Sequence, residues 1–222
     1  MTIQRGEAIL AVWTDIAPEA EDEFNEWYNT EHIPQLLGVP GFLHGRRDRA
    51  VEGKPRYLAL YELSDVNVLK SDAFRQVREE GRTAWTQKML PHFRNTTTGA
   101  YRQIFSHGTP PDKEAEVVLS VQLNIPADKE TEFNEWYNVD HVPALVGVPG
   151  VFCARRYVAV DGDPKYLAMY ELSDAKILGS PEWEQARNSE WTVRMRPHLL
   201  DAKIRVGRCL FPQGGCHENR RV

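Results

Sequence analysis

The first half of the chain arranges apolar and polar positions in a way that predicts a strand followed by a helix. Residues 7–16 (EAILAVWTDI) form a short apolar run rich in β-branched and aromatic side chains, which is typical of a buried strand. Pro18 then opens a helix whose first turn carries acidic residues, where they oppose the positive end of the helix dipole. Because a proline disfavours helical backbone in the residue before it, Pro34 predicts that this helix ends near His32. The same features recur in the second half at 116–125, Pro126, Pro143 and His141.

The pattern after this helix predicts a hairpin, a second helix and a last strand. Residues 41–63 hold two apolar segments joined by a turn at Gly53, a residue type that favours tight turns. The next segment carries Trp85 and Met89 toward the core on a helix, and a strand follows from Asn95. The second half has the equivalent positions at Gly162, Trp191, Met195 and Asp201.

The chain of 222 residues contains one unit written twice. The phrase FNEWYNTEHIP begins at Phe24 and FNEWYNVDHVP begins at Phe133, an offset of 133 − 24 = 109 residues. Each unit has the strand and helix order β-α-β-β-α-β of a ferredoxin-like fold. We expect the two sheets to pair, because each sheet alone would expose an apolar face. The predicted organisation is a repeat at 1–105, a linker at 106–114, a second repeat at 115–211 and a flexible tail at 212–222.

The phrase E-F-N-E-W-Y-N-x-[ED]-H-[IV]-P and its repetition resemble the dimeric α+β barrel superfamily, and within it tandem, EthD-like members. The resemblance covers both repeats. It implies an α+β fold in which the two ferredoxin-like units are fused into one pseudo-dimeric barrel, with a cavity between a sheet face and its helices. Members of the superfamily carry out muconolactone isomerisation, polyketide cyclisation, cofactor-free oxygenation and haem chemistry. The resemblance therefore implies the location of a site better than its reaction.

The first candidate catalytic residues are Asn25, Tyr28 and His32. At about 100° per residue on a regular helix they form one stripe of polar groups, beside a second stripe that contains Trp27. Convergent polar groups beside an apolar surface are typical of a ligand site. In the structural alternative, the Asn and Tyr satisfy buried backbone groups and the His caps the helix. Trp27 is interpreted as a core residue. The second repeat offers Asn134, Tyr137 and His141, with Trp136 in the core position.

A second set of candidates lies on the strands. Strict alternation would place Phe42, His44 and Arg46 on one face of a strand and Arg47 on the other. An arginine of the pair could bind a substrate carboxylate through two hydrogen bonds. The alternative is an ion pair with Glu62 or Glu171 across the sheet. The candidate substrate-binding residues are His44, Arg46, Arg47, Arg155, Arg156, Tyr61, Tyr170, Trp85 and Trp191.

The two repeats differ at positions that would affect chemistry. His44 is replaced by Cys153, and Glu31 by Asp140. We expect unequal sites, and we favour the N-terminal one because Glu31 and His44 would add ionisable partners to it.

Composition and charge exclude several classes of protein. Hydrophobic residues at 41% and charged residues at 27% are ordinary for a soluble domain, and a net charge of −5 gives no reason to expect a nucleic-acid partner. The sequence shows no apolar run of membrane-spanning length and no signal-peptide pattern. The cysteines lack metal-type spacing, so we expect a cytoplasmic protein with neither metal nor other cofactor. Its partner should be a small-molecule substrate, and a homo-oligomer beyond the internal pseudo-dimer stays open.

These residues favour a cofactor-independent enzyme that acts on a small unsaturated ring-cleavage product of an aromatic compound. The histidine would transfer a proton, and the Tyr and Asn would stabilise an oxyanion during double-bond isomerisation or methyl-ester hydrolysis. In this respect the tandem chain is similar to bacterial isomerase and methylesterase proteins of syringate-type catabolism. Two alternatives stay open: a non-catalytic module that binds hydrophobic metabolites, and a haem-binding oxygenase or peroxidase of the same superfamily.

Overall fold

The computed structural model describes residues 3–212. The flexible tail predicted at 212–222 lies outside these residues, except for Pro212 at the end of the last strand. Residues 106–108 of the predicted linker belong to a strand, since β4 continues to Gly108.

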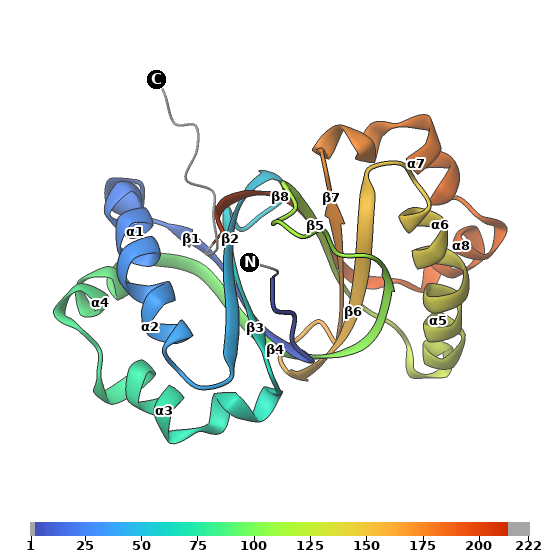
Figure 1. Cartoon of the computed structure of the whole chain (residues 1–222). Coiled ribbons are helices and arrows are strands. Elements are labelled where there is room, and N and C mark those ends of the chain that lie inside the picture. Colours follow the sequence, from blue (N-terminus) through green and yellow to red (C-terminus); the bar gives the residue numbers. More distant parts are fainter. Residues whose placement is uncertain (1–2, 213–222) are drawn as a thin grey trace.

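Eight antiparallel strands form one closed barrel with the order β1-β3-β2-β8-β5-β7-β6-β4 (Figure 1). Strands β1 to β4 belong to the N-terminal repeat and strands β5 to β8 to the C-terminal repeat. The two sheets join through the pairs β2–β8 and β4–β6, so each repeat supplies the edge partners that the other lacks. This confirms the predicted pseudo-dimeric α+β barrel. The strands are β1 Ala8–Ile16, β2 Phe42–Glu52, β3 Tyr57–Leu63, β4 Phe93–Gly108, β5 Val117–Asn124, β6 Val151–Asp161, β7 Tyr166–Leu172 and β8 Leu200–Pro212.

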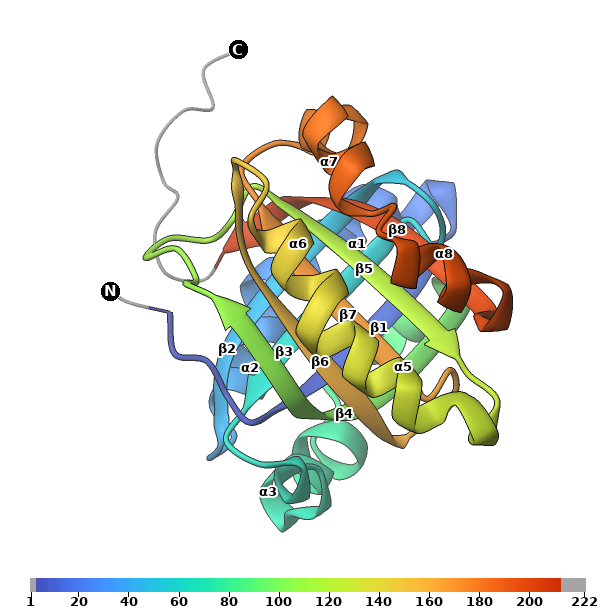
Figure 2. The same ribbon diagram turned by 90° about the vertical axis from the view of Figure 1, so that its right-hand side faces the viewer.

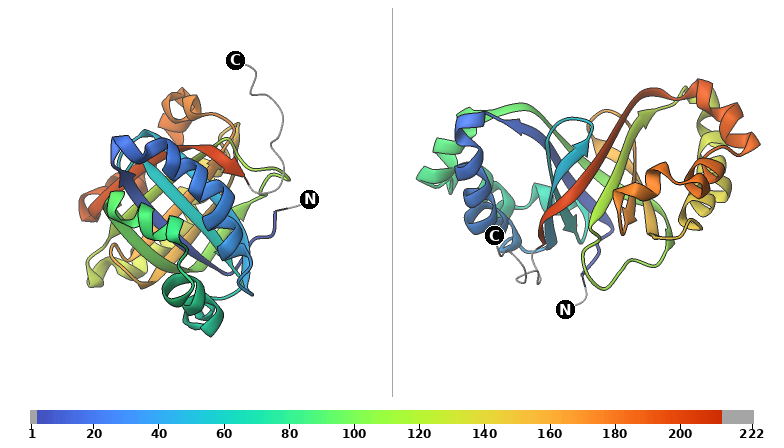
Figure 3. Two further views of the ribbon diagram at one scale, coloured as in Figure 1. Left: turned by 90° about the vertical axis from the view of Figure 1, so that its left-hand side faces the viewer. Right: turned by 90° about the horizontal axis from the view of Figure 1, so that it is seen from above.

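The helices cover the outer faces of the two sheets, so that the barrel lies between two helical layers (Figure 3). Figure 2 shows α5 and α6 lying across the C-terminal sheet. The α-helices are α1 Glu21–Trp27, α2 Ile33–Leu37, α3 Asp72–Arg75, α4 Ala84–Met89, α5 Glu130–Trp136, α6 Val142–Val146, α7 Pro181–Ala186 and α8 Glu190–Met195. Short 3-10 turns lie at Pro18–Ala20, Val66–Lys70, Leu90–His92, Ala127–Lys129, Ala175–Gly179 and Arg196–His198, and π-helical turns at Tyr28–His32, Gln76–Glu80 and Tyr137–His141.

The first helix does not end near His32, contrary to the sequence prediction. It passes through the π-helical turn Tyr28–His32, in which the Ile33 N–H bonds to the Tyr28 carbonyl five residues earlier, and continues as α2 to Leu37. Pro34 lies in the first turn of α2, directly after the wide turn, where its missing N–H falls in an already irregular part of the helical hydrogen-bond pattern. The wider turn thus lets the chain pass a proline without ending the helix. The second repeat does the same at Tyr137–His141 and Pro143.

A β-bulge near the start of β2 changes which side chains share a face. The register of β2 against β3 shifts between Phe42 and His44. Phe42 therefore faces the helices, where its ring stacks on Phe74 with centroids 5.5 Å apart, while His44 and Arg46 point into the barrel. The prediction that Phe42 shares a face with His44 and Arg46 is wrong, because strict alternation does not survive the extra residue of a bulge.

Three apolar cores hold the fold together. One lies between each sheet and its helices, and the third fills the barrel interior with residues such as Trp13, Tyr101 and Tyr157. Each sheet is therefore buried on both faces, which explains why β3 and β7 are buried along their whole length. The two cavities described below lie in the helix-side cores.

Candidate functional site

Each repeat encloses a cavity between its helices and the outer face of its sheet. The N-terminal cavity measures about 210 Å³ and the C-terminal cavity about 300 Å³. Both are lined mainly by apolar and aromatic side chains. Those lining the N-terminal cavity include Leu10, Val12, Trp27, Tyr28, His32, Tyr61 and Phe74, and those lining the C-terminal cavity include Leu119, Val121, Trp136, Tyr137, His141, Tyr170 and Trp183.

The π-helical turn brings three rings together on the wall of the N-terminal cavity. The His32 imidazole stacks on the Trp27 indole with centroids 4.5 Å apart, and its other contact is with the edge-on Tyr28 ring at 4.9 Å. Residues five apart would point in different directions on a regular α-helix. The same arrangement recurs in the second repeat, with 4.6 Å between Trp136 and His141 and 5.0 Å between Tyr137 and His141.

The predicted stripe of Asn25, Tyr28 and His32 is therefore split. Tyr28 and His32 line the cavity together with Trp27, whereas Asn25 points elsewhere. The Asn25 amide donates to the Glu21 carbonyl at 2.9 Å, and its oxygen accepts from Arg47 at 2.8 Å. Asn134 is placed in the same way, with Glu130 and Arg156 as partners at 2.9 Å and 2.9 Å.

Arg47 ties the helical segment to the sheet. From β2 its guanidinium donates to Asn25 and, at 2.7 Å, to the side chain of Asn29, and it lies 4.4 Å from the centre of the Tyr28 ring. The Arg47 N–H groups that were expected to bind a substrate carboxylate therefore donate to the side chains of Asn25 and Asn29. Asn25, Asn29 and Arg47 line a separate polar cavity of about 400 Å³ with Tyr57. Arg156 repeats the arrangement with Asn138 at 2.5 Å and the Tyr137 ring at 4.3 Å.

Both cavity histidines are neutral at physiological pH. Burial, together with the positive charge of Arg47, lowers the pKa of His32 to about 4. Burial also lowers the pKa of His141 to about 4, although Asp140 acts in the opposite direction. Neutral imidazoles can accept a proton or a hydrogen bond, or bind a metal ion.

Three polar atoms near the cavities are buried with few or no hydrogen bonds. The Nδ1 atom of His32 has no hydrogen-bond partner among residues 3–212. The hydroxyl groups of Tyr61 and Tyr170 interact with the phenols of Tyr28 and Tyr137, at a geometry outside that of a normal hydrogen bond. Burial, followed by this neighbouring phenol, raises the pKa of Tyr61 and Tyr170 well above the usual value. Buried hydroxyl groups with such weak partners can also bind a ligand.

The remaining aromatic candidates lie behind the cavities. Trp85 and Trp191 pack against the helix-side cores, and neither belongs to the described residues that line a cavity. The Trp85 indole donates to Glu23 at 3.0 Å.

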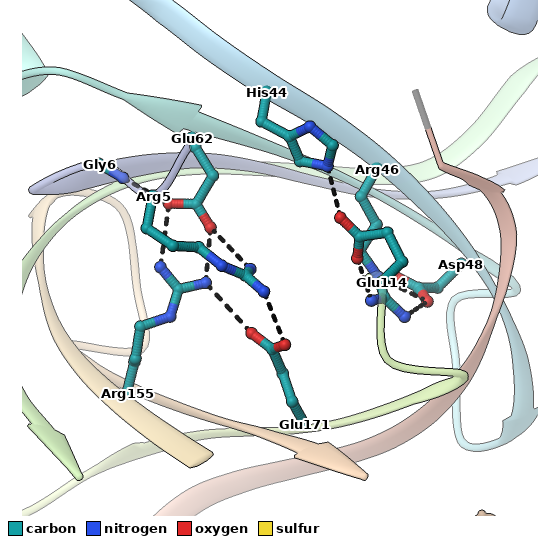
Figure 4. A network of polar contacts seen from close by, with 9 residues as sticks. All are labelled: Arg5, Gly6, His44, Arg46, Asp48, Glu62, Glu114, Arg155 and Glu171. Atoms are coloured by element: carbon teal, nitrogen blue, oxygen red, sulfur yellow. Dashed lines mark hydrogen bonds and ion pairs between the residues drawn. The ribbon is translucent and has the colours of Figure 1, made fainter. Parts of the chain in front are cut away.

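The strand residues His44 and Arg46 lie away from both cavities, in a cluster of charges inside the barrel that we name the barrel cluster (Figure 4). Glu114 lies between them, 2.5 Å from His44 Nε2 and 2.5 Å from the Arg46 guanidinium, which also binds Asp48 at 2.6 Å. Burial alone would raise the pKa of Glu114, but the His44 hydrogen bond and the Arg46 charge lower it to about 2. Glu114 lies in the predicted linker and was therefore not among the candidate residues. The cluster consists of Arg5, His44, Arg46, Asp48, Glu62, Glu114, Arg155 and Glu171.

The other half of the barrel cluster links the two repeats. Arg155 binds Glu62 of the opposite repeat at 2.5 Å, and its own-repeat partner Glu171 is 3.6 Å away. Arg5 binds Glu171 at 2.7 Å. Arg155 thus forms the ion pair that was the alternative interpretation, and its guanidinium is not free to bind a substrate. No sequence pattern marks Arg5 as part of this cluster, because its partners Glu62 and Glu171 are far away along the chain.

Two general features bear on the classes of ligand. Residues 3–212 contain no group of three or more His, Cys, Asp or Glu side chains arranged to hold a metal ion. Within the same residues, no helix has the length and apolar character needed to cross a bilayer.

The fold defines a pseudo-dimeric α+β barrel in which an equivalent cavity lies between the helices and the sheet of each repeat. Residues 7–106, the N-terminal repeat, match the family described as "Domain of unknown function (DUF4286)". None of the curated protein sequences matches the chain.

Solved structures with this fold cover almost the whole chain at low sequence identity. A protein of Fusobacterium nucleatum named a monooxygenase has a TM-score of 0.64 at 12% identity, over 96% of this chain and 98% of its own. A protein named anthrone oxidase-like has a TM-score of 0.67 at 11% identity, over 97% of each chain. A protein named a chlorite dismutase has a TM-score of 0.58 at 14% identity, over 93% of this chain and 96% of its own. At these identities the similarity shows the fold.

The prediction of an isomerase or methyl-ester hydrolase of aromatic catabolism is wrong. The three similar structures carry the names of a monooxygenase, an anthrone oxidase-like protein and a chlorite dismutase, and not of isomerases or hydrolases. The geometry agrees with this correction, because the arginines meant to hold a substrate carboxylate are engaged by protein groups.

Proposed function

We propose that the protein is an oxygenase that binds a planar, largely apolar small molecule in the cavities between its sheets and helices. The observation that carries the proposal is the lining of the N-terminal cavity. Aromatic walls surround two polar groups, the neutral His32 imidazole and the Tyr61 hydroxyl, whose described neighbour is the Tyr28 phenol. An apolar cavity with a few convergent polar atoms is the usual form of a small-molecule site.

The names of the similar structures support an oxygenase over the other open alternative, a passive binding module. Two of the three with the same barrel are named for oxidation by oxygen species, as a monooxygenase and an anthrone oxidase-like protein. Because this support concerns the fold alone, the proposed activity also rests on the side chains that line the cavities of this chain.

A haem-binding form of this activity would need a neutral nitrogen ligand and room for a porphyrin. His32 and His141 meet the first need, because both line a cavity as neutral imidazoles. The second need is not met. The larger cavity, about 300 Å³, is at the lower end of the range of about 300–1,000 Å³ for drug-sized ligands, and a porphyrin is larger than most of these. Haem does not fit the cavities in this conformation, and no step is assigned to it.

The side chains have simple roles in such a site. The Trp27 and Tyr28 rings provide flat apolar walls, and the Tyr61 hydroxyl donates a hydrogen bond to an oxygen atom of the ligand. The neutral His32 accepts a proton from an acidic group of the ligand, and a bound anion would raise its low pKa toward the working range.

Oxygen uptake tests the proposal. We expect the purified protein to consume dissolved oxygen with 1-naphthol or a related hydroxylated bicyclic aromatic, measured with an oxygen electrode. The double variant His32→Ala/His141→Ala should lose about 10²–10⁴ of this rate. The matched control is His107→Ala, an exposed histidine of β4 outside both cavities, which should keep it.

Equal oxygen uptake by the double variant and the wild type, with thermal stability measured in parallel, would contradict the proposal. A stoichiometric Soret band on titration with hemin would instead contradict the conclusion that haem does not fit, because it would show that the cavities open to admit a porphyrin.

A further inference from the structure

Two arginines belong to the lining of each cavity, on the helical segment around α3 and α4 or around α7 and α8. They are Arg78 and Arg82 in the N-terminal cavity and Arg187 and Arg196 in the C-terminal cavity. All four side chains are exposed, so they lie where the cavities open to solvent. Aromatic walls inside and guanidinium groups at the opening offer a ligand both an apolar surface and positive charge.

The first arginine occupies the same position in both repeats. Arg187 is the equivalent of Arg78, because 187 − 78 = 109 is the offset between the repeats. The Arg78 guanidinium lies 5.9 Å from the centre of the Phe74 ring, which is itself part of the cavity wall. Trp183 occupies the equivalent wall position of the C-terminal cavity. A positive charge four residues after an aromatic wall residue is therefore common to both cavities.

The second arginine comes from a different position in each repeat. The residue directly before the helix N-cap is Arg82 for α4, but Asn188 for α8. The residue directly after the helix is Leu90 for α4, but Arg196 for α8. The Arg196 guanidinium reaches back along α8 and donates to the Asn188 side chain at 2.7 Å. The charge that is absent at position 188 is thus supplied from position 196, so both repeats keep two guanidinium groups at the cavity opening.

Few acidic groups neutralise these arginines. Among residues 3–212, Arg187 forms an exposed ion pair with Glu184 at 3.3 Å, and the other three form none. The described linings contain one acidic residue, Glu52, in the C-terminal cavity. The lining therefore has a formal charge of +2 in the N-terminal cavity and, with Glu52, of 2 − 1 = +1 in the C-terminal cavity.

The arginine charges also act on the interior of the C-terminal cavity. Burial lowers the pKa of His141, and the charges of Arg196 and Arg187 act in the same direction. Their field therefore reaches the imidazole on the cavity wall. An anionic group bound at the opening would offset this field, whereas a neutral ligand would not.

We propose that each cavity binds an aromatic carboxylate, with the ring system between the aromatic walls and the carboxylate at the opening, where the two arginines bind it. Guanidinium groups suit this role because their paired N–H groups match the two oxygens of a carboxylate. The arginines concerned are not the strand arginines Arg47 and Arg156, whose N–H groups donate to asparagines. The inference names the ligand class of the proposed function and rests on it.

Calorimetric titration with 1-naphthoate and 1-naphthamide tests the ligand class. The two compounds have the same rings and nearly the same shape, and at neutral pH only the first carries a charge. We expect naphthoate to bind about three- to thirtyfold more tightly, the range for two charge pairs at a solvent-exposed opening. Added salt should weaken the binding of naphthoate and leave that of naphthamide unchanged, because salt screens exposed charges. Naphthamide should compete with naphthoate, since both rings occupy the same cavities.

Double variants assign the preference to each cavity. Arg78→Gln/Arg82→Gln should remove the preference for naphthoate at one of two sites per chain, and Arg187→Gln/Arg196→Gln should remove it at the other. The matched control is Arg75→Gln/Arg194→Gln. It removes the same net charge from α3 and α8 outside both cavity linings, and it should keep the preference at both sites. Thermal unfolding of each variant checks that the fold is intact.

Equal binding of the two compounds would overturn the inference and leave the aromatic cavity site in place. Naphthoate binding for which naphthamide does not compete would also overturn it, because the carboxylate would then be held outside the cavities. If neither compound bound, the proposed small-molecule site would fail together with the inference. The titrations do not require turnover, so a failure to consume oxygen would count against the oxygenase activity alone.

Discussion

The His32 imidazole lies almost parallel to the Trp27 indole, five residues earlier, with an angle of 21° and 4.5 Å between ring centroids. The π-helical turn produces this stack, and His141 and Trp136 repeat it. A duplicated irregularity of this kind is informative, because π-helical turns occur frequently at functional sites. It directs the following predictions to the cavity side of the helix.

Removing the Tyr61 hydroxyl should separate binding from stability. Because this hydroxyl is buried and interacts with the Tyr28 phenol outside normal hydrogen-bond geometry, Tyr61→Phe should change the free energy of unfolding by less than about 1.5 kcal/mol. The same change should weaken binding of an oxygenated aromatic ligand. Urea unfolding and ligand titration measure the two effects. The matched control is Tyr57→Phe, which should destabilise the protein because the Tyr57 hydroxyl donates to Glu21. A Tyr61→Phe variant that binds such a ligand normally would show that the hydroxyl serves packing alone.

Stability should fall in mild acid because of the two cavity histidines. An unfolded histidine has a pKa of about 6.5, and the folded values are about 4. Above about pH 6.5 both states are neutral and stability is complete. Between about pH 6.5 and 4 the unfolded chain binds protons that the folded protein excludes, so the free energy of unfolding should fall by at most about 3 kcal/mol per histidine.

Urea unfolding at pH 7.0 and 5.0 measures this loss. The variant His32→Gln/His141→Gln should show a flatter dependence in this range. Below about pH 4.5 a separate loss of stability should begin. The folded pKa of Glu114 is about 2, so in this range the unfolded chain binds a proton on Glu114 that the folded protein does not bind. A double variant that loses as much stability as the wild type between pH 7.0 and 5.0 would contradict the assignment.

The Arg155–Glu62 pair should be much more sensitive than a surface pair. Both side chains are buried, at 6% and 1% exposure, so Arg155→Met leaves a buried carboxylate with weakened compensation and should cost about 3–5 kcal/mol. The exposed pair Arg75–Asp72 is the control, and Arg75→Ala should change stability by less than about 1 kcal/mol. Urea unfolding compares the two variants. Similar costs for both would mean that the barrel cluster contributes little.

The N-terminal repeat should not be a well-behaved monomer on its own. Residues 1–108 would expose β2 without β8 and β4 without β6, and Glu62 would lose Arg155. Open strand edges favour pairing with another chain, so we expect this fragment to dimerise or aggregate. Size-exclusion chromatography with light scattering measures its mass beside that of the full chain. A stable monomeric fragment would show that a single repeat can satisfy its own sheet.

The architecture can be predicted from the sequence because the apolar periodicity and the repeat extend over nearly the whole chain. It fails where one extra residue changes a local geometry. The π-helical turn moves Asn25 away from His32, and the bulge moves Phe42 away from His44. Neither irregularity has a distinctive residue pattern, since each depends on packing against the sheet.

The charged residues show a second limit. Each repeat carries both an arginine pair and a glutamate, which suggests partners within the repeat, yet Arg155 binds Glu62 of the other repeat. A pairing between distant segments becomes visible only when the barrel closes. For the same reason the favoured N-terminal site cannot rest on His44, which lies in the barrel cluster.

Closure of the barrel within one chain also has an evolutionary consequence. In a symmetric homodimer every substitution is made twice, so a change that suits one cavity is imposed on the other. Joining the halves through β2–β8 and β4–β6 in a single polypeptide removes that constraint. One copy can keep an ancestral role while the other acquires mutations. The presence of Glu31 in one repeat and Asp140 at the equivalent position of the other is a difference that two identical subunits could not have.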